Sequence, residues 1–238
     1  MHRPTLIIKT GTKIPSLAEL HGDYEDWIAR GLGIAEPLVV DVSGGTALPP
    51  PQSVGQVLIT GSGAMVTDGS DWIEATAVWL RQAVAAATPI LGICFGHQLL
   101  AHALGGTVDY HPEGVEVGTV TITLTPAGRA DPLLGSLPER FPAQVSHSQS
   151  VLRVPSGARV LARSAHDAHQ AIAFTDTVWG LQFHPEFDAA IVRHYVNYYR
   201  ATLGTLGRDT DQLLADITDS PASASLLARF SALNSDTR

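Results

Sequence analysis

The first half of the chain alternates short apolar runs with longer amphipathic segments. The runs Thr5–Thr10, Leu38–Val42 and Gln56–Thr60 are rich in apolar and β-branched residues, and each is bounded by Gly, Pro or Ser. Pro89–Ile93 repeats this pattern. Continuous apolar runs of this length between turn-forming residues are typical of strands that are buried on both faces. We therefore expect four buried strands before residue 94.

Helical spacing appears between and after these strands. Apolar residues recur near the 3.6-residue period across Asp71–Ala87, with Asp68 or Ser70 as a candidate N-cap. A second helix is expected over Phe95–Leu104, closed by Gly105 and the glycine after it. Strand–helix–strand alternation predicts an α/β fold with a mostly parallel central sheet flanked by helices.

The pattern changes after Gly106. Further strands are expected, without intervening helices, at Val115–Leu124, Val145, Val151–Val154, Arg159–Ala162, Ala171–Phe174 and Val178–Phe183. This arrangement predicts an additional small antiparallel β region. Helical patterns return at Phe187–Leu203, Asp209–Ile217 and Pro221–Leu233. We expect one domain over residues 1–203 and a C-terminal helical extension over 204–238 that packs on it; a docking surface for another protein is the alternative for the extension.

Composition and charge narrow the class of protein. Hydrophobic residues make up 45% of the 238 residues and charged residues 16%, which excludes intrinsic disorder. The net charge of −8 and the lack of a basic run argue against a nucleic-acid partner. The most apolar stretch, Ala83–Gly106, is interrupted by polar residues, so no membrane span is expected. With no export signal visible and a single cysteine, the cytoplasm is the predicted location.

The single cysteine stands where a buried strand meets a helix. Gly92 and Gly96 flank Cys94 at two residues on either side, which is the spacing of a nucleophile elbow. The helix N-terminus favours a thiolate there, and the backbone N–H of Phe95 would point to a developing oxyanion. The alternative reading is a small buried core residue, as most free cysteines are.

A base and an orienting carboxylate follow a later strand. His184 and Glu186 are two residues apart, and Pro185 between them restricts the backbone. Both side chains can project from the end of an extended strand, which suits a base and its orienting group for a thiol nucleophile. On its own, such a pair is more often a structural hydrogen bond than a catalytic dyad, and the presence of Cys94 favours the catalytic interpretation.

Two other groups of residues have simpler interpretations. His166 and His169 are three residues apart but lack a third ligand, so we expect loop residues and no metal site. The segment from Asp23 to Trp27 fits either a gating loop near the site or the start of a helix, and a helix start is favoured.

The motif from Gly92 to Gln98, with Phe183-His184-Pro185-Glu186 about 85 residues later, closely resembles class I (triad-type) glutamine amidotransferases. Within that family the chain is similar to the amidotransferase domain of GMP synthetase and to free-standing γ-glutamyl peptidase-like members. The resemblance implies a flavodoxin-like fold. It also implies that Cys94 is the nucleophile, His184 the general base, and Glu186 the carboxylate that holds His184.

The resemblance also implies the substrate-facing groups. The oxyanion loop corresponds to Thr60–Ala64, where Ser62 or Gly63 would supply a second backbone N–H beside that of Phe95. Gln98 matches a position that contacts bound glutamine. The backbone of Ser146, His147 and Ser148 would lie around the α-amino and carboxylate groups, and Gln149 replaces the family's acidic residue.

The implied chemistry is hydrolysis of glutamine, or of a related γ-glutamyl amide, through a cysteine thioester. No metal or organic cofactor is required. The resemblance leaves open a stand-alone hydrolase, a glutaminase subunit that delivers ammonia to a separate synthetase, and a non-catalytic binding module. A homodimer is also compatible with the sequence. Other α/β hydrolases with a cysteine elbow fit the His-Pro-Glu segment less well.

Overall fold

The computed structural model describes residues 3–235, with side chains described through residue 233. The strands are β1 (Thr5–Lys9), β2 (Leu38–Asp41), β3 (Gln56–Ile59), β4 (Ile90–Ile93), β5 (Thr107–Tyr110), β6 (Glu116–Leu124), β7 (Arg140–His147), β8 (Gln149–Arg153), β9 (Arg159–Arg163), β10 (Ala171–Ala173) and β11 (Val178–Leu181). The α-helices are α1 (Tyr24–Leu32), α2 (Asp71–Ala85), α3 (Phe95–Ala103), α4 (Pro126–Arg129), α5 (Ala189–Tyr198), α6 (Arg200–Thr205), α7 (Thr210–Ala215) and α8 (Pro221–Ser235).

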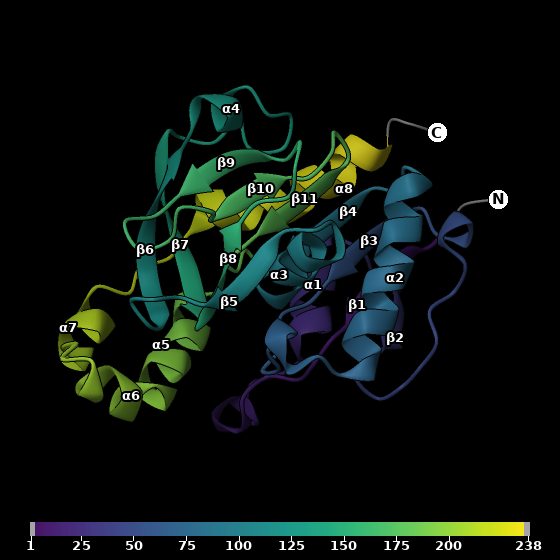
Figure 1. The fold of residues 1–238 in the computed structure, drawn as a ribbon. Coiled ribbons are helices and arrows are strands. Elements are labelled where there is room, and N and C mark those ends of the chain that lie inside the picture. Colours follow the sequence, from purple (N-terminus) through teal and green to yellow (C-terminus); the bar gives the residue numbers. More distant parts are fainter. Residues whose placement is uncertain (1–2, 236–238) are drawn as a thin grey trace.

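One nine-stranded sheet organises the molecule in the order β2-β1-β3-β4-β11-β10-β9-β6-β7. The first five strands in this order pair in parallel, and the remaining strands pair antiparallel. A separate two-stranded ribbon joins β5 and β8. The predicted α/β class, with a parallel sheet and an antiparallel β region, is therefore confirmed; the antiparallel strands extend the same sheet (Figure 1).

Helices cover both faces of the parallel half. Leu6 and Ile8 of β1 pack with α2 and α3, whereas Ile7 between them packs with α1 and α8. Because side chains alternate along a strand, a strand covered on both faces has to be apolar throughout, as β1 is. Figure 1 shows α2 and α3 in front of the sheet and α1 and α8 behind it.

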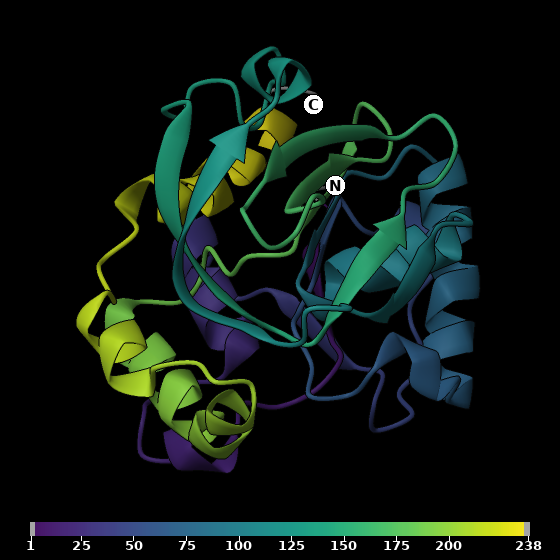
Figure 2. The same ribbon diagram turned by 60° about the vertical axis from the view of Figure 1, so that its left-hand side comes forward.

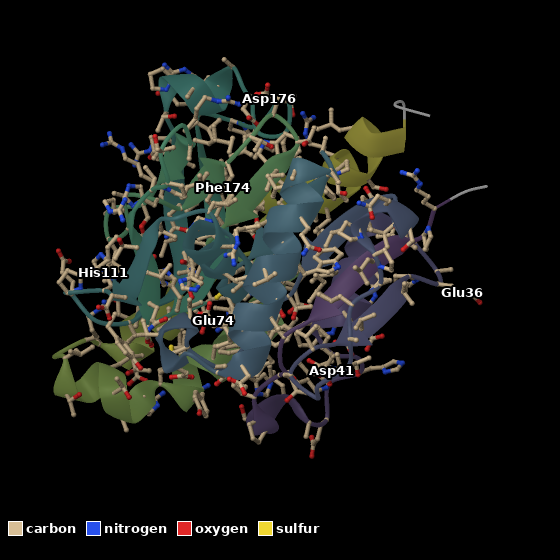
Figure 3. The ribbon with its side chains drawn as sticks, turned by 45° about the vertical axis from the view of Figure 1, so that its right-hand side comes forward. Glu36, Asp41, Glu74, His111, Phe174 and Asp176 are labelled. Carbon is tan, nitrogen blue, oxygen red and sulfur yellow. The ribbon has the colours of Figure 1, made fainter. Side chains whose placement is uncertain are left out.

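The C-terminal helices pack on this framework. Helix α8 contacts α1 and β7, and α7 contacts α5 and β6. Figure 2 shows α6 and α7 together at the end of the molecule opposite the C-terminus. Figure 3 places His111, which follows β5, across the molecule from Glu36 and Asp41 at the β2 edge.

Three local differences from the sequence prediction have clear causes. The single helix expected over 187–203 is two helices, α5 and α6, with Tyr199 between them. Helix α5 begins only at Ala189, because the side chain of Asp188 caps it by accepting from the N–H of Ile191. The strand β5 was missed because only Val108 of its four residues is buried. The strand β7 runs over eight residues, and not only near Val145, because it pairs along the whole of β6.

Two kinds of feature are absent from the described part of the chain. Among its helices, none is both long and apolar enough to cross a membrane. Within residues 3–235, no three or more His, Cys, Asp or Glu side chains are grouped in a way that would hold a metal ion.

Candidate active site

Cys94 occupies a strained turn between β4 and α3. Its φ of 51° and ψ of −101° lie in a region that side-chain-bearing residues rarely adopt. The flanking glycines make the turn possible: a Cβ on Gly92 would lie 2.4 Å from the carbonyl oxygen of Gly96, and one on Gly96 would lie 2.7 Å from the Cβ of Ile59. The elbow predicted from the sequence is confirmed as a backbone geometry.

The surroundings of the Cys94 thiol are formed by neighbouring strands. The Cys94 N–H donates to the carbonyl of Leu181 at 2.7 Å, which ties the elbow to β11. The sulfur is nearly buried and lies 3.7 Å from the carbonyl oxygen of Ser146 on β7. Phe95 begins α3, so its N–H is one of the amides without an acceptor inside the helix.

His184 and Glu186 come to the same edge of the sheet because β11 lies parallel to β4. The register pairs Leu181 with Ile93, so both strands end at one level and release the chain toward the same side. His184 Nδ1 and Glu186 Oε1 are 2.7 Å apart, and the two side chains are 3% and 0% exposed. The structure thus brings Cys94, His184 and Glu186 together.

The electrostatics of this group favour a charged imidazole. Burial of His184 disfavours its protonated form, but the Glu186 carboxylate and the charge and hydrogen bond of the Cys94 sulfur outweigh it and raise the pKa of His184 to about 10. An imidazolium between a carboxylate and a thiolate is the charge state that activates a cysteine nucleophile.

Aromatic rings hold the imidazole from one side. Phe187 stacks on His184 with ring centroids 3.9 Å apart and an interplanar angle of 8°. Tyr24 stacks on Phe187 at 6.1 Å, and the hydroxyls of Tyr24 and Tyr195 are hydrogen-bonded to each other. Tyr24 is the first residue of α1, whose N-cap Asp23 forms a capping box with Asp26. The predicted helix start is therefore confirmed.

The predicted oxyanion loop lies beside the cysteine and histidine. A Cβ on Gly61 would be 3.1 Å from His184 Cε1 and 3.9 Å from the Cys94 Cβ. The side chain of Ser62 points elsewhere: its hydroxyl donates to the carbonyl of Thr10 at 2.7 Å and accepts from the N–H of Ala64 at 3.0 Å. Gly63 is exposed and has open space around it.

Gln98 and Gln149 are both engaged inside the protein. Gln98 Nε2 donates to the backbone carbonyl of Gln149 at 2.7 Å and to Gln182 Oε1 at 3.0 Å. The Gln149 side chain accepts from the N–H of Val66 and donates to the Thr67 hydroxyl. It therefore fastens the loop after β3 to β8. The substrate contact expected of Gln98 stays a prediction.

The segment from Ser146 to Ser148 runs past the thiol, with its middle side chain turned inward. His147 Nε2 lies 2.9 Å from Glu116 Oε2, and both side chains are buried. Burial opposes the charge of His147, but the hydrogen bond and charge of Glu116 raise its pKa. The hydroxyl of Ser146 is buried and has no hydrogen-bond partner within the described part of the chain. The substrate contact expected of Ser146, His147 and Ser148 stays a prediction.

Glu116 has further partners that the sequence analysis missed. Its carboxylate also accepts from the hydroxyl of Ser164 at 2.8 Å and from Gln170 Nε2 at 2.7 Å. These residues come from separate strands and loops, so no spacing in the sequence could have grouped them. Phe187 was closer to detection because it directly follows Glu186.

The fold and the site define an α/β protein with Cys, His and Glu side chains gathered where two parallel strands end. The family model for class-I glutamine amidotransferases matches residues 51–195, and this chain belongs to that family. The resemblance inferred from the motifs is confirmed, as is the prediction of an enzyme of the glutamine amidotransferase class.

Individual relatives agree with this assignment. The chain is 38% identical over 184 residues to a glutamine-hydrolyzing GMP synthase of Aeropyrum pernix, covering 75% of this chain but only 33% of that protein. It is 30% identical over 167 residues to one subunit of the glutamine-hydrolyzing GMP synthase of Halobacterium salinarum, covering 70% of this chain and 85% of the relative. The crystal structure of a glutamine amido transferase from Methylobacillus flagellatus superimposes with a TM-score of 0.77 at 26% identity, covering 98% of this chain and 94% of that one.

Proposed function

We propose that this chain hydrolyses the side-chain amide of glutamine, or of a related γ-glutamyl compound, through a thioester on Cys94. The observation that carries this proposal is the alignment of Glu186, His184 and Cys94, with 2.7 Å between the carboxylate and the imidazole and a sulfur that interacts with the same ring. A nucleophile, a base and an orienting carboxylate in this order are the requirements of acyl transfer by cysteine.

The first half of the reaction forms the thioester. The Cys94 thiolate attacks the carbonyl carbon of the side-chain amide, and the negative charge moves to the carbonyl oxygen. Backbone N–H groups of Phe95 and of the oxyanion loop stabilise that charge. As the oxyanion collapses, the carbon–nitrogen bond breaks, and the His184 imidazolium gives its proton to the departing nitrogen. Ammonia or a larger amine leaves.

The second half regenerates the enzyme. His184, now neutral, takes a proton from a water molecule as that water attacks the thioester carbonyl. The carbon–sulfur bond then breaks, glutamate leaves, and the thiolate and imidazolium are restored. Glu186 stays ionised throughout and keeps the imidazole oriented through its Nδ1 hydrogen bond.

A second candidate function is delivery of ammonia to a separate synthetase. The observation that favours it is the match to a protein named as one subunit of a GMP synthase, of which this chain covers 85%. The two candidates share the chemistry at Cys94 and differ in the fate of the released nitrogen.

We also propose the division of the chain into a catalytic domain over 1–203 and a packed extension over 204–238. Leu226, Leu227 and Phe230 of α8 lie in one buried cluster with residues of the central sheet, which supports the packing. A Cβ on Gly31 would lie 2.3 Å from the Leu227 side chain, so α1 and α8 are in close contact.

The test is glutamate release by the purified chain with L-glutamine and with a panel of γ-glutamyl peptides, beside Cys94→Ala. Turnover that depends on Cys94, together with an acyl-enzyme seen by mass spectrometry of rapidly quenched samples, supports the proposal. Preference for peptides points to a stand-alone hydrolase, whereas turnover of glutamine alone points to an ammonia-supplying subunit. Undiminished turnover by a folded Cys94→Ala variant would contradict the mechanism.

A further inference from the structure

The oxyanion loop is fastened to the end of β1 by a set of side-chain hydrogen bonds. The hydroxyl of Thr10 lies 3.0 Å from the carbonyl oxygen of Thr60 and 3.0 Å from that of Gly61. The hydroxyl of Thr60 accepts from the Thr10 N–H at 3.0 Å and donates to the Gly61 carbonyl at 2.9 Å. The Gly61 carbonyl therefore points toward two hydroxyls.

The direction of this carbonyl fixes the direction of the next amide. The described residues contain no cis peptide bond, and in a planar trans peptide the C=O and the following N–H point in opposite directions. Since the Gly61 carbonyl faces Thr10 and Thr60, the Ser62 N–H faces away from them. A Cβ on Gly61 would lie 3.1 Å from His184 Cε1 and 3.9 Å from the Cβ of Cys94, so the Gly61–Ser62 peptide runs along the candidate site.

Ser62 adds a second attachment through its side chain. Its hydroxyl donates to the Thr10 carbonyl at 2.7 Å and accepts from the Ala64 N–H at 3.0 Å, so it joins β1 to the far side of the loop. Close approach is possible because residue 11 is glycine: a Cβ there would lie 2.6 Å from the Ser62 hydroxyl. Thr10 itself is almost completely buried, which shields these hydrogen bonds from water.

We propose that Thr10 and Ser62 are positioning residues that hold the Gly61–Ser62 peptide with its N–H toward Cys94, so that the oxyanion hole is already assembled in the isolated chain. This inference rests on the proposed function and assigns the second oxyanion donor to Ser62 and not to Gly63. Neither hydroxyl contacts the substrate; each acts through the backbone. A preformed donor stabilises the oxyanion without reorganisation during the reaction.

The test compares Thr10→Val and Ser62→Ala with the wild type and with Thr5→Val. Thr5 is a buried threonine at the start of β1, whereas Thr10 directly follows the end of that strand; the Thr5 hydroxyl accepts one hydrogen bond from Gln56 Nε2 at 2.9 Å, far from the loop. Its replacement therefore controls for the loss of a buried threonine hydroxyl in the same part of the sheet.

Three measurements separate positioning from general damage. We expect kcat for glutamine to fall about tenfold or more in Thr10→Val and Ser62→Ala with KM nearly unchanged, since outright loss of an oxyanion donor costs about 100- to 1000-fold. Alkylation of Cys94 by iodoacetamide forms no oxyanion, so its rate should stay within about twofold. The backbone ¹⁵N order parameters of Gly61 and Ser62 should drop from about 0.85 toward about 0.6 in both variants and stay high in Thr5→Val.

The outcomes are distinct. Unchanged kcat and unchanged order parameters in both variants overturn the proposal. Alkylation that slows in proportion to kcat also overturns it, because the substitutions would then impair the reactivity of the Cys94 thiol and not the oxyanion hole. If the wild type hydrolyses no γ-glutamyl amide, the proposed function fails, but the order parameters still test whether Thr10 and Ser62 hold the loop. A drop of the order parameters in Thr10→Val and Ser62→Ala supports this positioning role, and unchanged order parameters overturn it.

Discussion

The ring of Phe187 lies flat against the imidazole of His184, with centroids 3.9 Å apart and an interplanar angle of 8°. Phe187 is 3% exposed and also packs against Tyr195, with ring centroids 5.2 Å apart. The carboxylate of Glu186 fixes one ring nitrogen, but a single hydrogen bond leaves the imidazole free to tilt about it. The stacked phenyl ring therefore sets the plane in which His184 meets the sulfur of Cys94.

Replacing this ring should affect the reaction more than the fold. For Phe187→Leu we expect kcat to fall about tenfold, because small misplacements of a reacting group are costly. The loss of stability should be about 1–2 kcal/mol, measured by urea unfolding. Phe141→Leu is the matched control, since Phe141 is equally buried but contacts Phe183 and not His184. Equal loss of kcat in both variants would show that the ring has no specific effect on His184.

The raised pKa of His184 predicts how stability depends on pH. The folded-state pKa of about 10 lies above the ordinary value near 6.5, so between these values His184 keeps a proton in the folded protein that it loses in the unfolded chain. The stabilisation is complete below about pH 6.5 and is lost as pH rises toward 10, by up to about 1.4 kcal/mol per pH unit.

Glu186→Gln should flatten this dependence, because it removes the carboxylate that opposes the cost of burying the charge. The measurement is the free energy of unfolding in urea at pH 7, 8 and 9 under reducing conditions, for the wild type and for Glu186→Gln. Parallel slopes for the two proteins would mean that Glu186 does not sustain the charge of His184.

The strained backbone at Cys94 predicts an unusual order of stability. An exchange of alanine for glycine in regular structure ordinarily costs about 0.5–1 kcal/mol. At this position, φ of 51° and ψ of −101° strain any residue with a Cβ by about 1–3 kcal/mol. We therefore expect Cys94→Gly to be at least as stable as Cys94→Ala by thermal and urea unfolding, with both variants inactive. A Cys94→Gly variant clearly less stable than Cys94→Ala would argue against strain at the elbow.

Two glycines of the oxyanion loop should respond differently to the same change. Gly61→Ala would place a methyl group 3.1 Å from His184 Cε1, closer than ordinary packing, whereas nothing lies within 4 Å of the equivalent position on Gly63. We expect Gly61→Ala to lose about tenfold or more in kcat with the fold intact, and Gly63→Ala to stay within about twofold. Steady-state kinetics with circular dichroism checks both. A fully active Gly61→Ala variant would place the loop farther from His184 than the structure has it.

Much of the fold was accessible from the sequence because its parallel half is buried on both faces. The apolar runs of β1, β3 and β4 and the period of α2 are direct consequences of that burial. The antiparallel half was harder: β5 is mostly exposed, and β7 owes its length to pairing with β6. The break between α5 and α6 was missed because helical periodicity continues across Tyr199.

The sequence by itself determined the chemistry that is available. The glycines around Cys94 and the proline between His184 and Glu186 are local backbone requirements, and local requirements are written in consecutive residues. From them followed the elbow, the candidate base and its carboxylate, and the family.

Only the tertiary structure decided what holds these groups in place. Phe187 is close to His184 in the sequence, but its stacking on the imidazole depends on how the two side chains are oriented. Two other contacts join segments that are distant along the chain: the hydrogen bonds between Thr10 and the oxyanion loop, and the pairing of buried Glu116 with His147. Such contacts produce no recognisable residue spacing in the sequence, because they arise from the order of strands in the sheet and from the level at which each strand ends.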